Sequence, residues 1–322
     1  MTAPGTAATP QLAPTAPAAG APGSPGRLGA LGPVGLVLAG GISVQFGGAL
    51  AVTLMPRAGA LGVVALRLLV AAVVLLVICR PRLRGHSRTD WGTVVAFGVT
   101  MAAMNGLFYQ AVDRIPLGAA VTLEVLGPLA LSVVVSRRAL NLVWAGLALA
   151  GVFLLSGGGG DGGHGGGFGG GLDLAGVAFA LGAGAMWAAY IVFSARTGRR
   201  FPQADGLALA MAVGALLFLP LGLAESGTKL ADPVTLGLGA AVALLSSVLP
   251  YTLELLALRR MPASTFAIMM SLEPAVAAVA GFLILDQTLT TIQAAAIALV
   301  VAASMGAVRT QVGRSKPAVP EA

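Results

Sequence analysis

Four charged residues interrupt long apolar runs of this sequence: Arg67, Glu124, Glu254 and Glu273. Insertion scales put the cost of a charge at the centre of a spanning helix at about 2.5–3.5 kcal/mol. Four such charges facing lipid would cost on the order of 10 kcal/mol, which is comparable to the whole stability of a typical protein. These side chains are therefore expected to face inward, to pair or to be protonated. A guanidinium can hold a carboxylate, and carboxylates can hold an ammonium group or a proton.

Two prolines stand close to two of these acids. Pro128 has no N–H for the carbonyl of Glu124, and Pro274 likewise frees the carbonyl of Met270. A freed carbonyl beside a carboxylate predicts a polar pocket suited to a cation or an ammonium group. Kinking prolines also serve packing alone in spanning helices, so both interpretations stay open.

The depth of each charge follows from a rise of about 1.5 Å per residue. Arg67 and Glu124 each lie about 10 Å below the outer surface on that rise, and Asn105 reaches the same layer from inside. Depth thus permits an Arg67–Glu124 ion pair, which would be a purely structural role. Glu273 lies near mid-membrane, whereas Glu254 lies near the inner face, where a snorkelling side chain is the alternative.

Polar and aromatic residues extend this set along shared helix faces. Residues three or four positions apart lie on one face of a helix, although a lone intramembrane aromatic more often belongs to the core. No metal site is predicted from these residue types. The candidate substrate and proton pathway comprises Gln45, Arg67, Asn105, Tyr109, Glu124, Trp187, Tyr190, Tyr251, Glu254 and Glu273, with helix breaks at Pro128 and Pro274.

The elements that must position these residues are membrane-spanning helices. The chain is 57% hydrophobic and 10% charged, whereas a soluble domain carries about a quarter charged residues. A spanning helix needs about 20 mostly apolar residues. Ten such runs are predicted, at 33–55, 60–79, 91–112, 117–135, 140–156, 172–195, 203–224, 234–257, 263–285 and 289–308.

The basic residues orient these runs. With the N-terminus in the cytoplasm, 15 of the 19 Lys and Arg residues fall on the cytoplasmic side, three fall outside and Arg67 lies within a span. This asymmetry predicts that both termini are cytoplasmic. Because the basic residues form no patches between aromatics, the net charge of +7 does not indicate a nucleic-acid partner. The single Cys79 excludes an internal disulfide.

The chain divides into two related halves. Residues 111–128 align without gaps on residues 257–274, with Ala, Arg and both prolines coinciding. Five spans per half is an odd number, so the halves must be inverted in the membrane, which is typical of secondary transporters. The predicted organisation is a disordered tail (1–31), a five-helix repeat (32–156), a Gly-rich outer loop (157–171), a second five-helix repeat (172–308) and a cytoplasmic tail (309–322).

Several function classes lack their signatures. The two histidines, His86 and His164, lie outside the predicted spans, so proton coupling would have to use carboxylates. No G-x-x-x-x-G-K-[ST] motif for a nucleotide is present, nor a G-x-S-x-G or H-E-x-x-H motif of a hydrolase. Asp161 and His164 are two metal-ligand types on a loop with 12 glycines in 15 residues, which indicates a linker rather than a metal site.

The sequence resembles the EamA branch of the drug/metabolite transporter superfamily, and within it the bacterial threonine/homoserine exporters. The most specific stretches are "MNGLFYQAVDRIPLGAAVTLEVLGPLA" (104–130) and residues 249–281, which include "LPYTLELLALRRMP" and "TFAIMMSLEPAVAAVAG". The resemblance covers both halves and implies ten spans, with the pathway residues above matching polar span positions of the family. The long N-terminal tail, the Gly-rich loop and Asp-Gln in "LDQTL" (285–289) depart from the family pattern.

These features predict an all-α membrane protein of the bacterial plasma membrane that is not an enzyme. The resemblance implies a secondary active transporter that exports small amino acids such as threonine and homoserine by proton antiport. The inverted repeat predicts alternating access, with no cofactor beyond the proton gradient and with membrane lipid and a small molecule as partners. A carrier for another metabolite or a drug is the alternative. The sequence does not indicate whether the protein is a monomer or a homodimer.

Overall fold

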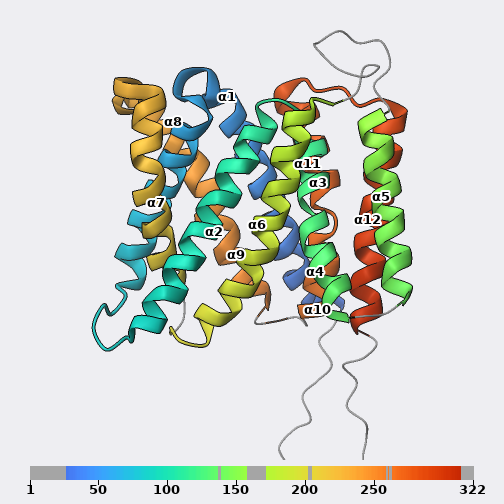
Figure 1. Ribbon diagram of the computed structural model, residues 1–322, viewed down its shortest axis with the longest axis horizontal. Helices are drawn as coiled ribbons and strands as arrows, with labels where there is room; N and C mark the ends of the chain where they lie inside the picture. Colours follow the sequence, from blue (N-terminus) through green and yellow to red (C-terminus); the bar gives the residue numbers. More distant parts are fainter. Residues whose placement is uncertain are drawn as a thin grey trace, which may run out of the picture.

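The computed structural model describes residues 27–136, 139–157, 172–201, 205–258, 260 and 263–312, and every regular element in these ranges is a helix. The helices run roughly side by side in one bundle (Figure 1). In chain order they are α1 (Arg27–Cys79), α2 (Arg88–Val112), α3 (Leu117–Glu124), α4 (Leu126–Ser136), α5 (Ala139–Gly157), α6 (Leu174–Gly198), α7 (Asp205–Ser226), η1 (Gly227–Ala231), α8 (Pro233–Ala243), η2 (Leu244–Val248), α9 (Leu249–Leu258), α10 (Ala263–Met270), α11 (Glu273–Leu285) and α12 (Thr291–Val312).

The bundle has the length and the surface of a membrane protein. Seven helical stretches in the described ranges are long and apolar enough to cross a membrane, and two shorter apolar helices accompany them. Large apolar side chains remain exposed on the outside, among them Val77 (64%) and Leu216 (73%). Such a surface would be costly in water. It is ordinary for a bundle in lipid, where helices pair all of their own backbone polar groups. The chain is therefore a multi-span membrane protein whose regular elements are all helical in the described ranges.

The long element α1 is two helices that meet at Gly59. This residue has φ 62° and ψ 169°, a backbone region essentially restricted to glycine. The helix that starts after Gly59 has first-turn N–H groups without intrahelical partners. Glu225, at the end of α7, accepts from two of them, Leu61 N–H (2.7 Å) and Gly62 N–H (3.0 Å). The predicted spans 33–55 and 60–79 are thus joined by a turn that a distant carboxylate caps.

Two other helices are interrupted close to the prolines that predict a break. Only Val125 separates α3 from α4, three residues before Pro128. Ser271 and Leu272 separate α10 from α11, in which Pro274 is the second residue. At each break the proline lacks the N–H that would pair with the carbonyl four residues earlier, that of Glu124 or of Met270.

The two interrupted helices contact each other through α3 and α11. A Cβ on Gly118 of α3 would lie 2.9 Å from Ala278 of α11, so the small residue allows the close approach. At the start of α3, Leu117 N–H donates to Gln287 Oε1 at 3.0 Å. Gln287 belongs to the "LDQTL" segment that departs from the family pattern, and it fills a helix-capping role there.

The remaining helices pack in pairs around this centre. α1 packs against α7, α2 against α6 and α5 against α12. The main core is built of small and aliphatic residues from α1, α2, α3 and α7, with Tyr109 as its largest fully buried side chain. A separate small cluster joins α4, α5 and α12 at one edge of the bundle, where Figure 1 shows α5 and α12 side by side.

The helix bounds correct the predicted tails. α1 begins at Arg27, so residues 27–31 are helical rather than part of a tail. At the other end α12 continues to Val312, four residues past the predicted end of its span. Residues 158–171 of the Gly-rich loop, including Asp161 and His164, lie outside the described residues, as do the basic residues Arg137, Arg138 and Arg259.

Candidate functional site

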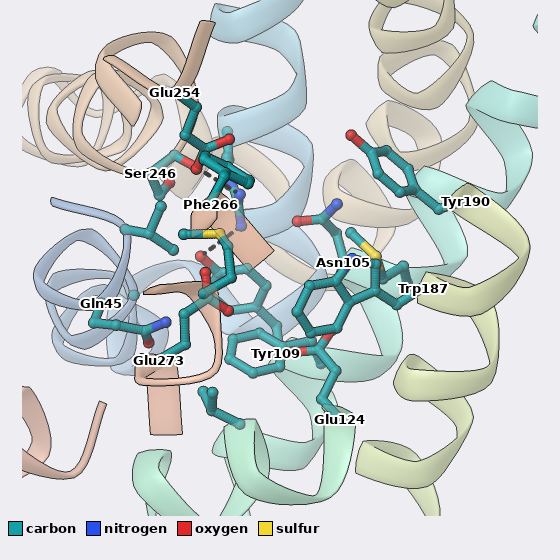
Figure 2. Close-up of a pocket in the computed structure, with 17 residues that line it drawn as sticks. Gln45, Asn105, Tyr109, Glu124, Trp187, Tyr190, Ser246, Glu254, Phe266 and Glu273 are labelled. Carbon is teal, nitrogen blue, oxygen red and sulfur yellow. Dashed lines mark hydrogen bonds between the residues drawn. The ribbon is translucent and has the colours of Figure 1, made fainter. Parts of the chain in front are cut away.

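A cavity of about 320 Å³ lies in the interior of the bundle. Pockets for small molecules measure roughly 300–1,000 Å³, so this volume suits a small ligand. Residues from α1, α2, α3, α6, η2, α9, α10 and α11 line it, and Figure 2 shows them converging from several helices. The lining residues are Val44, Gln45, Gly48, Arg67, Met104, Asn105, Phe108, Tyr109, Val121, Glu124, Trp187, Tyr190, Ser246, Glu254, Phe266, Met270 and Glu273.

The structure brings nine of the ten predicted pathway residues to this one cavity. They are Gln45 and Arg67 on α1, Asn105 and Tyr109 on α2, Glu124 on α3, Trp187 and Tyr190 on α6, Glu254 on α9 and Glu273 on α11. The tenth, Tyr251, belongs to α9, but its side chain lies outside the described part of the chain. The observation is that the nine residues lie around one cavity. Their part in transport stays a prediction.

Arg67 is held by three hydrogen bonds. Its Nε donates to Ser247 Oγ (3.2 Å), its Nη1 donates to Tyr109 Oη (3.2 Å) and its Nη2 donates to the carbonyl of Ser246 (3.0 Å). The guanidinium also lies 5.7 Å from the centre of the Tyr109 ring, within the range of a cation–π interaction. Arg67 is therefore fixed by neutral groups rather than by a carboxylate.

This arrangement replaces the Arg67–Glu124 ion pair that depth alone permits. Among the residues that the structure describes, no ion pair joins the two side chains, and the ion pairs within 4 Å are Arg114–Asp113 and Arg200–Asp90. The estimate of depth placed Arg67 and Glu124 in one layer, and both do line one cavity. Depth alone could not show that the hydroxyl groups of Ser247 and Tyr109 and the carbonyl of Ser246 would be the hydrogen-bond partners of the Arg67 guanidinium.

The hydrogen bonds of Arg67 leave part of the guanidinium unused. An arginine has five N–H donors in one plane. One donor on each of the three nitrogens is taken, so one N–H remains on each terminal nitrogen. These N–H groups remain available as donors to a carboxylate, which arginine commonly binds through two N–H groups.

Two of the three partners of Arg67 come from a segment that sequence reasoning missed. Ser246 and Ser247 belong to η2, a single π-helical turn in the rod that runs from α8 to α9. π-Helical turns inside α-helices are frequent at functional sites. A signal was present, because Pro250 has no N–H for the carbonyl of Ser246 four residues earlier. The proline argument was applied to Pro128 and Pro274 but not to Pro250.

The carbonyl of Glu124 that Pro128 frees lies against α6, and its part in ligand binding stays a prediction. It faces Gly184 of α6 so closely that a Cβ added there would lie 2.5 Å from the carbonyl oxygen. A Cβ on Gly127 would likewise overlap the carbonyl oxygen of Gly184. The break before Pro128 is thus used to bring the backbones of the α3–α4 rod and α6 together. Glu124 itself lines the cavity.

The three carboxyl groups enter the cavity from different helices. No side-chain hydrogen bond or ion pair holds Glu124, Glu254 or Glu273 among the described residues. Glu254 lines the cavity and packs close to Gly40 of α1. Glu273 opens α11, where the positive end of the helix dipole favours a negative charge.

The remaining polar lining consists of amides and aromatic rings. Asn105 is buried, and its Nδ2 donates to the carbonyl of Met101 at 2.8 Å, which leaves its amide oxygen for the cavity. Gln45 is 4% exposed and also lines the cavity. Tyr190 packs on Phe97 with ring centres 5.2 Å apart. Within the described ranges, no group of three or more His, Cys, Asp or Glu residues could hold a metal ion.

Comparison with known proteins gives a consistent relationship over both halves. Residues 174–309 match the model of the EamA-like transporter family. The threonine/homoserine exporter RhtA of Escherichia coli K12 is 41% identical over 281 residues, which are 87% of this chain and 92% of the exporter. RhtA of Salmonella typhimurium LT2 is 41% identical over 268 residues, 83% of this chain and 88% of the relative.

More distant matches extend over much of the chain. The transporter YwfM of Bacillus subtilis, whose function is uncharacterised, is 28% identical over 208 residues, 62% of this chain and 67% of its own. A solved structure described only as "Crystal structure of protein" superimposes with a TM-score of 0.56 at 18% identity. The superposition covers 88% of this chain and 99% of the chain in the solved structure. At this identity it supports a shared fold and nothing more.

Proposed function

The chain belongs to the EamA-like transporter family, with the threonine/homoserine exporters as its relatives, and we propose from this premise that it exports small amino acids of the threonine/homoserine type. The observation that carries the proposal is the cavity, which is lined by one guanidinium and three carboxyl groups from four helices. A free amino acid needs groups of both signs, because it carries a carboxylate and an ammonium group.

Arg67 is the candidate for binding the substrate carboxylate. Its position is fixed by Tyr109, Ser247 and the Ser246 carbonyl, and one N–H on each terminal nitrogen remains unused. A pre-positioned planar fork loses little conformational freedom when it binds. A substrate carboxylate supplies acceptors for these two N–H groups of Arg67 and also neutralises the part-buried positive charge of its guanidinium.

The three carboxyl groups are candidates for the ammonium group and for the exchanged proton. If all three were ionised, one guanidinium would leave two negative charges unbalanced in a region of low dielectric. An unpaired buried charge costs several kcal/mol. Binding of a proton or of a substrate ammonium removes that cost, so the two cations compete for the same carboxyls. Competition of this kind is the physical basis of antiport. Glu124 and Glu273 are the proposed carriers.

The helix order supports a proposal of ten spans in two inverted halves. If α1 counts as two rods divided at Gly59, and α3–α4, α8–α9 and α10–α11 each count as one, the described chain has ten rods. In each group of five, the fourth rod is interrupted, at α3–α4 and at α10–α11 respectively, and in the second group η2 also interrupts the third. We place both termini in the cytoplasm of a bacterium with the rods in its inner membrane. Rocking of one half on the other would alternate access to the cavity.

The proposal excludes two other classes of membrane protein. A membrane enzyme would be a departure from relatives that are transporters. A channel could not accumulate a solute against its gradient. The energy source proposed is the proton gradient, with no cofactor.

The test is a substrate panel in proteoliposomes with an imposed pH gradient. Purified protein should move threonine and homoserine against their gradients only when a pH gradient is present. Accumulation of substrate against its gradient in the absence of a pH gradient would contradict the antiport proposal. If drugs or other metabolites are transported and amino acids are not, the protein is a carrier of another substrate class within the same family.

A further inference from the structure

Arg67 is anchored mainly by a segment far away in the sequence. Ser247 Oγ and the Ser246 carbonyl lie 180 and 179 residues from Arg67 along the chain, and both belong to η2. Tyr109, the third partner, lies on α2. The Nε and Nη2 contacts hold one edge of the guanidinium. Moving η2 would therefore turn the guanidinium, which lines the cavity.

Three features allow η2 to set the orientation of the Arg67 guanidinium. The π-helical turn places the Ser247 side chain and the Ser246 carbonyl toward the same guanidinium. Pro250 removes the N–H that would compete in an α-helix for the Ser246 carbonyl. Gly47 of α1 allows η2 to approach closely, since a Cβ at this position would lie only 2.9 Å from the Ser246 backbone nitrogen. Ser43 of α1 also donates to the Leu245 carbonyl at 2.6 Å and ties the two segments together.

We propose that Ser247 is a positioning residue, which with the Ser246 carbonyl freed by Pro250 orients Arg67 so that the carrier selects substrates bearing a carboxylate. The proposal rests on the proposed amino-acid transport by this cavity. It assigns to the π-helical turn a role in specificity rather than in folding alone. Ser247 is 1% exposed, and its hydroxyl oxygen accepts from the charged Nε, so its loss leaves a buried donor without a partner.

The experiment measures carboxylate selectivity in proteoliposomes. Unlabelled threonine and threoninamide compete with labelled threonine, and the ratio of their half-inhibitory concentrations reports the preference for the carboxylate. In Ser247→Ala this preference is expected to fall about tenfold, a factor that corresponds to ~1.4 kcal/mol. The inhibition by threoninamide should change little. A mutation that only loosens the fold would weaken both competitors alike and would leave the ratio unchanged.

Matched variants keep the test valid if Ser247→Ala folds poorly. Ser247→Thr and Ser247→Val have nearly the same shape, but only threonine keeps the hydroxyl, so the preference should survive in the first and fall in the second. Ser43→Ala removes a hydroxyl from the same contact between α1 and η2 without touching Arg67, and the ratio should stay at its original value. Equal ratios in the Thr and Val variants would overturn the proposal.

Pro250→Ala tests the carbonyl separately. The new N–H can compete for the Ser246 carbonyl, so carboxylate preference should fall, whereas thermal stability in detergent should not. If the unaltered protein transports no amino acid, the proposed function itself fails. If it transports threonine with a strong carboxylate preference that the Ser247 and Pro250 variants retain, only the positioning role fails.

Discussion

The contact between the broken helix and α6 gives the sharpest prediction, for Gly184→Ala. The added Cβ would lie 2.5 Å from the Glu124 carbonyl oxygen and 3.2 Å from its carbonyl carbon. Ordinary contact begins at 3.4 Å, so the backbones must separate by about 0.9 Å. Both atoms belong to backbone and cannot rotate away. Overpacking of this kind costs about 1–3 kcal/mol, which outweighs the ~1 kcal/mol that alanine gains over glycine in a helix.

Gly182→Ala on the same helix is the matched control. Its Cβ would meet Leu107 Cδ1 at 3.4 Å, an ordinary contact with a flexible side chain. Thermal unfolding in detergent should show Gly184→Ala less stable than the parent and Gly182→Ala unchanged or slightly more stable. Because Glu124 would shift with its backbone, threonine transport in proteoliposomes should fall at least about tenfold in Gly184→Ala, given the tolerance of about 0.5 Å in functional sites. Equal stability and transport in the two variants would refute the close contact.

Three further changes test the remaining parts of the site. Arg67→Lys keeps the charge but loses the planar fork, so KM for threonine should rise about tenfold or more, since a hydrogen bond to a charged group contributes about 1.5–3 kcal/mol; an unchanged KM would rule out the bidentate clamp. Glu124→Gln and Glu273→Gln should each be assayed for accumulation driven by a pH gradient and for exchange without one. The variant that lacks the proton carrier should lose the first and keep part of the second, and full accumulation in both would dismiss the carboxyl roles. Glu225→Ala removes the cap of the helix after Gly59 and should lower the free energy of unfolding by about 1 kcal/mol, whereas Glu225→Gln, which keeps an acceptor oxygen, should lower it less.

The sequence identified the class of the protein and most of the cavity because both depend on cost in lipid. Charges such as Arg67 and Glu273 are expensive in an apolar run, so their presence alone indicates an interior that uses them. Prolines act on the carbonyl four residues earlier, which is a local rule, and the helix breaks lie close to Pro128 and Pro274. Shared helix faces and the family resemblance together then pointed to amides and aromatic rings such as Gln45 and Trp187.

Partners of these residues could not be read in the same way. A rise of 1.5 Å per residue gives depth along a span but no angle around it and no neighbour. Depth therefore allowed an Arg67–Glu124 pair, while the packing of α1 against η2 supplied Ser247 and the Ser246 carbonyl instead. Two adjacent serines in an apolar run carry little cost, so the only sequence signal for this segment was Pro250, which frees the carbonyl of Ser246 but does not name its partner.

The sequence by itself determined which residues cannot face lipid and where the helices must break, since both follow from the chemistry of single residues and their near neighbours. Only the tertiary structure decided how those groups are used. It turned the Glu124 carbonyl toward Gly184, where two glycines allow backbone contact. It brought a π-helical turn from 180 residues away onto Arg67. Contacts between distant helices depend on small residues at the points where the helices cross. Such contacts cannot be read from one segment of sequence, because they require two surfaces whose shapes are complementary.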